Sequence, residues 1–193
     1  MKVGLMGGTF DPIHLGHLRA AENAREALGL DLVRFIPASV PPHRPGPLTP
    51  AMDRYAMVAL ATATHPAFVA SDVELLRSGP SYTADTLETL RAAFPSDELY
   101  LIVGSDTFPE VRTWREPERI FAQCRVAVVH RPGEVRTTDV PEVPTDRVCW
   151  VEGAGLPISA TEVRRRVREG HSIRYLVAEA VADYIHKRGL YRG

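Results

Sequence analysis

The sequence predicts an α/β fold with a doubly wound, mostly parallel sheet and helices on both of its faces. Two observations support this prediction. Apolar, β-rich runs alternate with helical patterns along the chain, which is typical of α/β proteins. Most of these runs are nearly continuous, as expected for strands buried on both faces of a parallel sheet. Right-handed crossovers between such strands then place helices on both faces.

Strands and helices are expected in alternation. The apolar runs predict strands over 2–6, 32–37, 68–73, 99–104, 125–130 and 147–152. The helical patterns cover 15–29, 50–63, 83–94, 116–122, 160–169 and 176–188. Local signals fix several helix ends. Gly29 and Pro95 end two helices, and Thr49-Pro50 supplies a cap residue followed by proline at the first helical position.

The composition is that of one ordinary globular domain. With 193 residues, the chain is expected to form a single domain over 1–193, with a small C-terminal helical portion from about residue 158. A net charge of −1 argues against a general nucleic-acid or membrane-surface partner. No apolar run approaches the length of a membrane span, no leader is evident, and Cys124 and Cys149 match no metal spacing. A cytoplasmic location is therefore expected.

The polar motifs follow the predicted strands. In doubly wound sheets, ligands bind beyond the carboxyl ends of the strands. The segment from Gly7 to His17 follows the first strand, Gly104-Ser105-Asp106 follows the fourth, and Arg131 follows the fifth. A proline-rich loop after the second strand carries His43 and Arg44. The sequence thus predicts a site at this edge of the sheet.

The first of these segments, GGTFDPIHLGH, predicts phosphate binding. Its glycines are expected to form a turn that lets a phosphate approach backbone amides. His14 and His17 are three residues apart at a helix start and project to the same side, with Gly16 between them to limit bulk. The alternative is that both histidines only stabilise the helix start. The segment lacks G-x-G-x-x-G and His-Glu-x-x-His, which disfavours a redox dinucleotide and a zinc protease site.

The segment ISATEVRRR predicts a second phosphate contact. Ser159 and Glu162 match a capping box, so a helix begins here. Arginines near a helix N-terminus oppose the macrodipole unless an anion is bound there. Arg164 lies beside the apolar stripe of this helix and is expected to bind phosphate. The remaining arginines are expected to form a solvated face: Arg165, Arg166 and Arg168.

Three further groups admit two interpretations each. The segment GPSYTADT predicts a helix with Thr83 as its N-cap, and the amides at this helix start could also hold a carboxylate. Asp106 either caps a turn or accepts a hydrogen bond from a ribose hydroxyl. Trp114 belongs either to the core or to the wall of an aromatic pocket.

Together, GGTFDPIHLGH and ISATEVR resemble the nucleotidyltransferase superfamily with a His-x-Gly-His motif, here His14-Leu15-Gly16-His17. Further matches, PPHR, SYTADTLE, GSD, TW and SIRYLV, resemble the bacterial nicotinate-nucleotide adenylyltransferases nearly end to end. The resemblance implies a Rossmann-like nucleotidyltransferase fold. It also implies an enzyme of NAD biosynthesis that joins ATP and nicotinate mononucleotide, with Mg²⁺, to give nicotinate adenine dinucleotide and pyrophosphate. Ala178 departs from the pattern, because proline is expected there.

The resemblance further implies roles for individual residues. His14, His17 and Arg164 would be catalytic. The residues expected to bind ATP are Gly7, Gly8, Thr9, Phe10, His14, His17, Gly104, Ser159, Thr161 and Arg164. Tyr82 and Thr83 would meet the nicotinate carboxylate, Trp114 would stack on the pyridine, and Asp106 would bind the mononucleotide. Further phosphate contacts would come from His43, Arg44 and Arg131. The resemblance assigns no protein ligand to the metal.

The residue types suit this reaction. The attacking phosphate monoester is largely dianionic near neutral pH because its second pKa is about 6, so it needs no general base. Imidazoles, helix-start amides, an arginine and Mg²⁺ can align the reactants and stabilise the developing charge. No activated Ser or Cys nucleophile is evident, and direct transfer is therefore predicted.

Several alternatives remain open at this level. The same scaffold could use another acceptor: nicotinamide mononucleotide, phosphopantetheine, or glycerol phosphate with CTP. A non-catalytic nucleotide sensor would typically have lost His14, His17 or Arg164, and all three are present. A nucleic-acid-binding protein would need a broad basic stripe, which the charge balance does not provide. The oligomeric state stays open, a homo-oligomer included.

Overall fold

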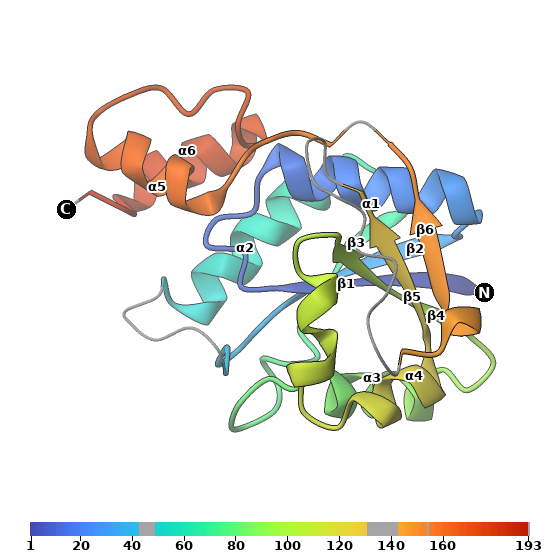
Figure 1. Cartoon of the computed structure of the whole chain (residues 1–193). Helices are drawn as coiled ribbons and strands as arrows, with labels where there is room; N and C mark the ends of the chain where they lie inside the picture. The colour runs from blue at the N-terminus through green and yellow to red at the C-terminus, as the bar shows by residue number, and fades with distance from the viewer. Residues whose placement is uncertain (43–48, 131–142, 154, 193) are drawn as a thin grey trace.

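The parallel sheet is the central element of the fold (Figure 1). The structure is a computed structural model, and it describes residues 1–42, 49–130, 143–153 and 155–192. Within these residues, six strands pair in parallel in the order β3-β2-β1-β4-β5-β6. The strands are β1 (Lys2–Gly8), β2 (Leu32–Pro37), β3 (Phe68–Ala70), β4 (Glu98–Gly104), β5 (Arg125–Val129) and β6 (Val148–Val151). The predicted α/β fold is confirmed.

The helices lie close to their predicted positions. They are α1 (Leu15–Leu28), α2 (Ala51–Thr62), α3 (Thr83–Ala93), α4 (Pro117–Gln123), α5 (Ala160–Arg168) and α6 (Glu179–Arg188), with short 3-10 helices η1 (Phe108–Thr113) and η2 (Thr145–Arg147). The sequence did not predict η1 or η2. Pro50, and not Thr49, caps α2, because the backbone carbonyl of Pro50 accepts the first helical hydrogen bond, from the backbone N–H of Arg54 over 3.1 Å. None of the helices in the described ranges is long and apolar enough to cross a membrane.

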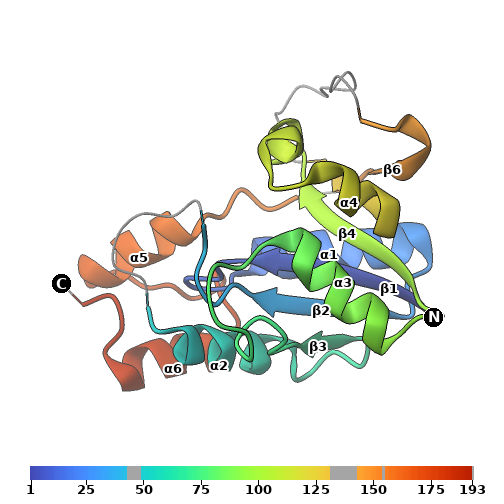
Figure 2. The same ribbon diagram turned by 90° about the horizontal axis from the view of Figure 1, so that it is seen from below.

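The sheet has a hydrophobic core on each of its two faces, and a layer of helices covers each core. On β4, Leu99, Leu101 and Val103 face one core, whereas Tyr100 and Ile102 face the other, because successive side chains of a strand point to opposite faces. The first core packs under α3 and α4, and the second under α1, α2, α5 and α6. Figure 2 shows α3 in front of the sheet and α1 behind it. The strands are therefore buried on both faces.

The order of the strands reverses between β1 and β4. β1 pairs with β2 on one side and with β4 on the other. In sheets of this type the crevice beyond the carboxyl ends of the strands at the reversal is the ligand site. This places the segments after Gly8 and Gly104 side by side.

Ala178→Pro is expected to stabilise the protein. Ala178 caps α6 with φ −60° and ψ 146°, values that proline adopts without strain, and Val177 before it forms a β-bridge with Arg174. Proline reduces the freedom of the unfolded chain, so the free energy of unfolding should rise by about 0.4–1 kcal/mol. Urea unfolding measures the change. Ala182→Pro, inside α6, should instead destabilise by about 3 kcal/mol or more, and a loss of stability in A178P would contradict the prediction.

Candidate active site

The segment after β1 leaves the sheet at the strand reversal. Gly7 and Gly8 are the last residues of β1, so the predicted glycine turn was wrong: the turn follows them, and Phe10 adopts the left-handed conformation there with φ 49°. A Cβ on Gly7 would meet nothing within 4 Å, whereas a Cβ on Gly8 would lie 3.2 Å from the Phe10 ring. Gly7 thus leaves open space beside the backbone, and Gly8 makes room for Phe10.

His14 and His17 form the start of α1. His14 is the N-cap, and its backbone N–H donates to Nδ1 of His17 over 3.2 Å. The two rings stack with their centroids 3.7 Å apart. Because Nδ1 of His17 accepts this bond, the neutral ring carries its proton on Nε2 and can donate from there. The structural interpretation of this pair as the start of a helix is confirmed, and its role in phosphate binding stays a prediction.

Buried neighbours fix the two imidazoles. The ring of Phe10 is 3% exposed and meets His17 edge to face, with ring centroids 5.1 Å apart. A Cβ on Gly16 would lie 3.0 Å from Nδ1 of His14 and 3.3 Å from the carbonyl oxygen of Leu156. A side chain at Gly16 would therefore crowd His14 and the chain before α5. The side chains of Phe10 and His14 are buried and support His17 from behind.

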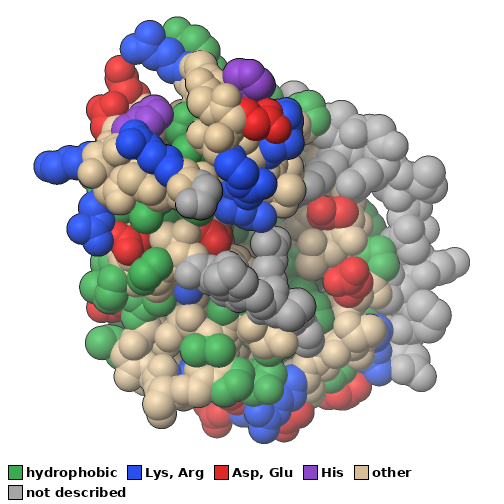
Figure 3. All heavy atoms as spheres, turned by 90° about the vertical axis from the view of Figure 1, so that its left-hand side faces the viewer, with side chains coloured by type: hydrophobic (Ala, Val, Ile, Leu, Met, Phe, Trp, Pro, Cys, Tyr) green, Lys and Arg blue, Asp and Glu red, His purple; other side chains and the backbone are tan. Residues whose placement is uncertain are grey.

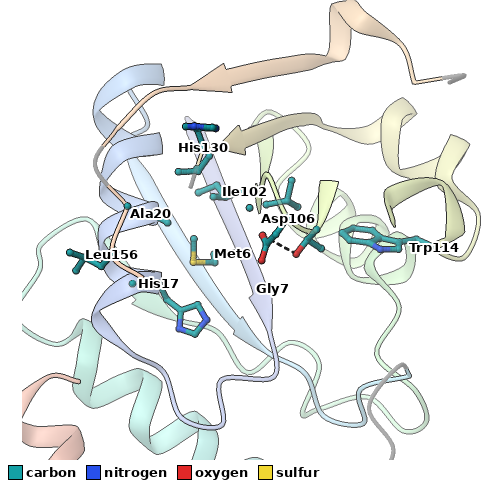
Figure 4. Close-up of a pocket in the computed structure, with 15 residues that line it drawn as sticks. Met6, Gly7, His17, Ala20, Ile102, Asp106, Trp114, His130 and Leu156 are labelled. Atoms are coloured by element: carbon teal, nitrogen blue, oxygen red, sulfur yellow. Dashed lines mark hydrogen bonds between the residues drawn. The ribbon is translucent and has the colours of Figure 1, made fainter. Parts of the chain in front are cut away.

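A first cavity, the His17 pocket, has a volume of about 220 Å³. Figure 4 shows His17 on α1 and Asp106 after β4 on either side of Gly7, with His130 at one end and Trp114 beyond Asp106. It is lined by Met6, Gly7, Gly16, His17, Ala20, Ile102, Val103, Gly104, Asp106, Thr107, Trp114, Val129, His130, Gly155 and Leu156. An apolar floor with a few polar groups is typical of a small-molecule site.

A second cavity, the Tyr82 pocket, has a volume of about 520 Å³ and adjoins the first. The two pockets share five lining residues: Gly7, Ile102, Val103, Thr107 and Trp114. Gly8 and Thr9 line the Tyr82 pocket, together with Tyr82 and Thr83. Two ligands could therefore meet above Gly7.

The start of α3 forms one wall of the Tyr82 pocket. Tyr82 is the N-cap and Thr83 the first helical residue, so the prediction of Thr83 as N-cap was off by one position. The guanidinium of Arg115 lies over the Tyr82 ring, 4.5 Å from its centroid. Unpaired amides and the positive end of the helix dipole favour an anion at such a start.

Asp106 and Trp114 lie between the two cavities. Asp106 is exposed, lines the His17 pocket, and shares a 3.4 Å hydrogen bond with the hydroxyl of Thr107. Trp114 is half-buried and lines both pockets, so the pocket-wall interpretation fits its position. Gly104 also lines the His17 pocket.

The helix α5 brings Arg164 to the segment after β1. Ser159 is the N-cap of α5, and its hydroxyl accepts from the backbone N–H of Glu162 as predicted. Nη1 of Arg164 donates to the backbone carbonyl of Asp11 over 2.7 Å, and Nη2 donates to the hydroxyl of Thr161 over 3.2 Å. Arg164 thus lies beside the segment that leads to His14, although it lines neither cavity.

The macrodipole argument for the α5 arginines was wrong. The helix ends at Arg168, so the predicted solvated arginines occupy its last turn, where the dipole favours cations. Arg165 pairs with Glu162 and Glu169 on an exposed face. Figure 3 shows Lys and Arg side chains gathered on the upper part of the molecule, where α5 and α6 lie.

Some of the predicted contacts lie outside the described residues: His43, Arg44 and Arg131. Sequence reasoning also missed several residues of the pockets, among them His130 and Glu74. His130 follows β5, and its buried Nδ1 has no hydrogen-bond partner in the described part of the chain. The rule that ligands bind beyond the carboxyl ends of the strands singled out Arg131, and the same rule could have found His130. Glu74 lines the Tyr82 pocket, where burial raises the pKa of its carboxyl. No local sequence pattern marks Glu74 as a pocket residue.

The chain is similar to known proteins along nearly its whole length. Residues 5–166 match the family model described as cytidylyltransferase-like. A relative from Thermus thermophilus is 50% identical over all of both chains, and one from Dictyoglomus thermophilum is 45% identical over 99% of this chain and 100% of its own. Both are named "probable nicotinate-nucleotide adenylyltransferase".

Solved structures share the fold. A Plasmodium falciparum nicotinic acid mononucleotide adenylyltransferase complexed with NaAD superimposes with a TM-score of 0.82 at 19% identity, over 98% of this chain and 97% of that one. The same enzyme complexed with APC gives a TM-score of 0.80 at 19% identity, over 98% and 96% of the two chains. At this identity the likeness shows the fold alone.

Proposed function

The chain belongs to the nicotinate-nucleotide adenylyltransferases of the cytidylyltransferase-like family, and we propose that ATP occupies its His17 pocket and nicotinate mononucleotide its Tyr82 pocket. The activity joins these substrates into nicotinate adenine dinucleotide and releases pyrophosphate, in NAD biosynthesis. The observation that carries the assignment is the shared lining of the two pockets at Gly7, which lets two substrates meet.

The proposed transfer is direct. An oxygen of the nicotinate mononucleotide phosphate attacks the α-phosphorus of ATP, and the bond from that phosphorus to the bridging oxygen of the β-phosphate breaks. Pyrophosphate carries away the electron pair. Nε2–H of His17 and the guanidinium of Arg164 stabilise the charge that develops on the phosphate oxygens. His14 and Gly16 hold His17 in place, and Ser159 and Thr161 support the arginine.

The remaining assignments follow from the positions of the groups. The adenine ring would lie between Leu156 and His130, which both line the pocket. Asp106 would accept from a ribose hydroxyl at the junction of the two pockets. The amides of Tyr82 and Thr83 would hold the nicotinate carboxylate, and Trp114 would stack on the pyridine. His43, Arg44 and Arg131 remain proposed phosphate contacts.

Magnesium would enter with ATP. Mg²⁺ dehydrates reluctantly and is commonly bound through substrate phosphates and water. Among its described residues, the His17 pocket offers one carboxylate, Asp106, which suits an ion held mainly by the nucleotide. When bound, the ion neutralises charge on the leaving pyrophosphate.

We further propose that the whole chain acts as one cytoplasmic domain, with the portion from about residue 158 supplying Arg164. The contact of Arg164 with Asp11, 153 positions away in the sequence, supports a single unit. The thiols of Cys124 and Cys149, which are not paired with each other, suit a reducing compartment.

Pyrophosphate release with ATP and Mg²⁺ tests the proposal, with nicotinate mononucleotide, nicotinamide mononucleotide and phosphopantetheine offered in parallel. Preference for nicotinate mononucleotide is expected. Preference for the amide would reassign the carboxylate site at Tyr82 and Thr83. Turnover with phosphopantetheine alone would overturn the pyridine pocket, and no turnover at all would favour a nucleotide sensor.

Trp114→Ala is expected to raise the KM for nicotinate mononucleotide by about 10–100-fold, because stacking on an aromatic ring contributes about 1–3 kcal/mol per base. The KM for ATP should change less. Steady-state kinetics with each substrate varied in turn measures both. Trp114→Phe keeps a flat ring and should retain most of the affinity. Equal, small effects of both substitutions would remove Trp114 from the substrate site.

A further inference from the structure

Arg54 is a buried arginine outside the predicted site. It lies in the first turns of α2 and is 1% exposed. Met57, Val58 and Ala61, which follow it at helical spacing, are buried on the same face of α2. A charged group rarely occupies such a position unless specific partners compensate for its burial.

The partners of Arg54 are three backbone carbonyls from three segments. Nη1 donates to Thr9 over 2.7 Å, Nη2 donates to Ser39 over 3.1 Å, and Nε donates to Thr49 over 2.9 Å. Thr9 follows β1, Ser39 follows β2, and Thr49 precedes α2. A planar guanidinium fixes the directions of all three bonds at once, so it sets how these segments lie relative to one another.

A chain of hydrogen bonds continues from Ser39 to the start of α3. The backbone N–H of Ser39 donates to the hydroxyl of Ser81 over 2.9 Å, and Ser81 in turn contacts the carboxylate of Glu74. Glu74 also accepts from the hydroxyl of Thr86 over 2.6 Å. Ser81 directly precedes Tyr82, so the guanidinium is linked to the proposed carboxylate site.

These contacts connect the two substrate sites through one side chain. Thr9 and Ser81 both line the Tyr82 pocket, and the segment that begins at Thr9 leads to His14 and to His17 of the other pocket. We propose that Arg54 is a positioning residue that sets the alignment of the two substrates through Thr9, Ser39 and Ser81. This inference rests on the proposed function of the two pockets. Arg54 touches neither substrate and acts only through the backbone that it holds.

The test compares Arg54→Lys and Arg54→Met with wild type in the full chain. Both variants should lower kcat by about 10²-fold, the scale of a misplacement of about 1 Å between reactants. The Kd of ATP–Mg²⁺ alone and of nicotinate mononucleotide alone, measured by calorimetry, should change by no more than about threefold, because each pocket persists by itself. Lysine keeps the charge but not the planar fork, so a wild-type kcat in R54K would overturn the proposal.

Arg91→Lys is the matched control. Arg91, on α3, also donates to two backbone carbonyls, those of Asp97 and Gln123, and neither lines the two pockets. A loss of Tm without a loss of kcat is expected for R91K. A loss of Tm without a loss of kcat in both Arg54 variants would show that Arg54 only stabilises the fold, and it would overturn the inference. The proposed function would still stand if wild type makes nicotinate adenine dinucleotide.

Ser81→Ala tests the chain without disturbing the buried charge. It should lower kcat by about tenfold with little change in either Kd, since it removes the hydroxyl that Ser39 contacts, while the backbone N–H of Ser81 still donates to the carbonyl of Val40 over 2.9 Å. The double variant R54K/S81A should lose about as much as R54K alone, because both substitutions break one chain. Multiplicative losses would contradict the proposal. If neither Arg54 variant folds, an unchanged kcat in S81A overturns it.

Discussion

His17→Ala is expected to lower kcat by about 10²–10³-fold, the scale of losing one preorganised hydrogen-bond donor. Nδ1 of His17 accepts a hydrogen bond from the backbone N–H of His14, and Nε2–H is the donor proposed to meet the phosphates of ATP. The substitution removes this donor at the strand reversal. The sheet does not depend on the His17 side chain, so the variant should still fold. Steady-state kinetics at saturating ATP and nicotinate mononucleotide measures the loss, and near-normal turnover would remove His17 from the mechanism.

Two variants separate the catalytic role of His17 from its role at the helix start. His17→Gln keeps a side chain that can reach back to the N-cap amide, so it should restore stability without restoring kcat. His65 is the matched control, because its Nδ1 accepts from the backbone N–H of Ala67 and its ring stacks on Phe68 with centroids 3.8 Å apart. His65→Ala should leave kcat unchanged.

Arg164→Ala is expected to lower kcat/KM for ATP by about 10²-fold, because a cation that stabilises developing phosphate charge is lost. Its bond to the carbonyl of Asp11 orients the guanidinium at the segment leading to His14. Kinetics with ATP varied at saturating nicotinate mononucleotide measures the effect. Arg164→Lys should recover only part of it, since lysine lacks the planar fork.

Arg165→Ala is the control for helix charge. Arg165 carries the same charge on the next residue of α5, but it pairs with Glu162 and Glu169 on the exposed face. Exposed pairs of this kind contribute about 0–1 kcal/mol to stability, and we expect kcat/KM for ATP to stay near wild type. Equal losses in R164A and R165A would show that the overall charge of α5, and not a specific contact, attracts ATP.

Most of the fold was predictable because its signals are local. Apolar runs, most of them nearly continuous, marked every strand, and β2 has the predicted bounds of 32–37. The bounds that differ from the predicted ones lie where tertiary contacts compete with the local preference of the chain. β3 ends at Ala70 because it pairs with β2 over three residues, and α6 starts at Glu179 because the carbonyl of Leu176 accepts from Leu15 instead of continuing a helix.

The site was predictable as a set of motifs but not as a geometry. The pairing of His14 with His17 follows from their spacing in one helical turn, and the sequence correctly placed both at the start of α1. It did not show that Phe10 supports His17 or that Glu74 lies in a pocket. These facts depend on which segments meet at the strand reversal.

Arg54 shows most clearly what could not be predicted from the sequence. Its helical spacing to Met57, Val58 and Ala61 placed it on an apolar face, which could have marked it as unusual. Its three partners, however, come from residues 9, 39 and 49, which only the folded sheet brings to one point. The sequence by itself determined the strands, the approximate positions of the helices and the chemical groups available for phosphate transfer, because these depend on neighbours along the chain. The tertiary structure alone decided which carbonyls compensate the buried charge, because such partners must come from different segments.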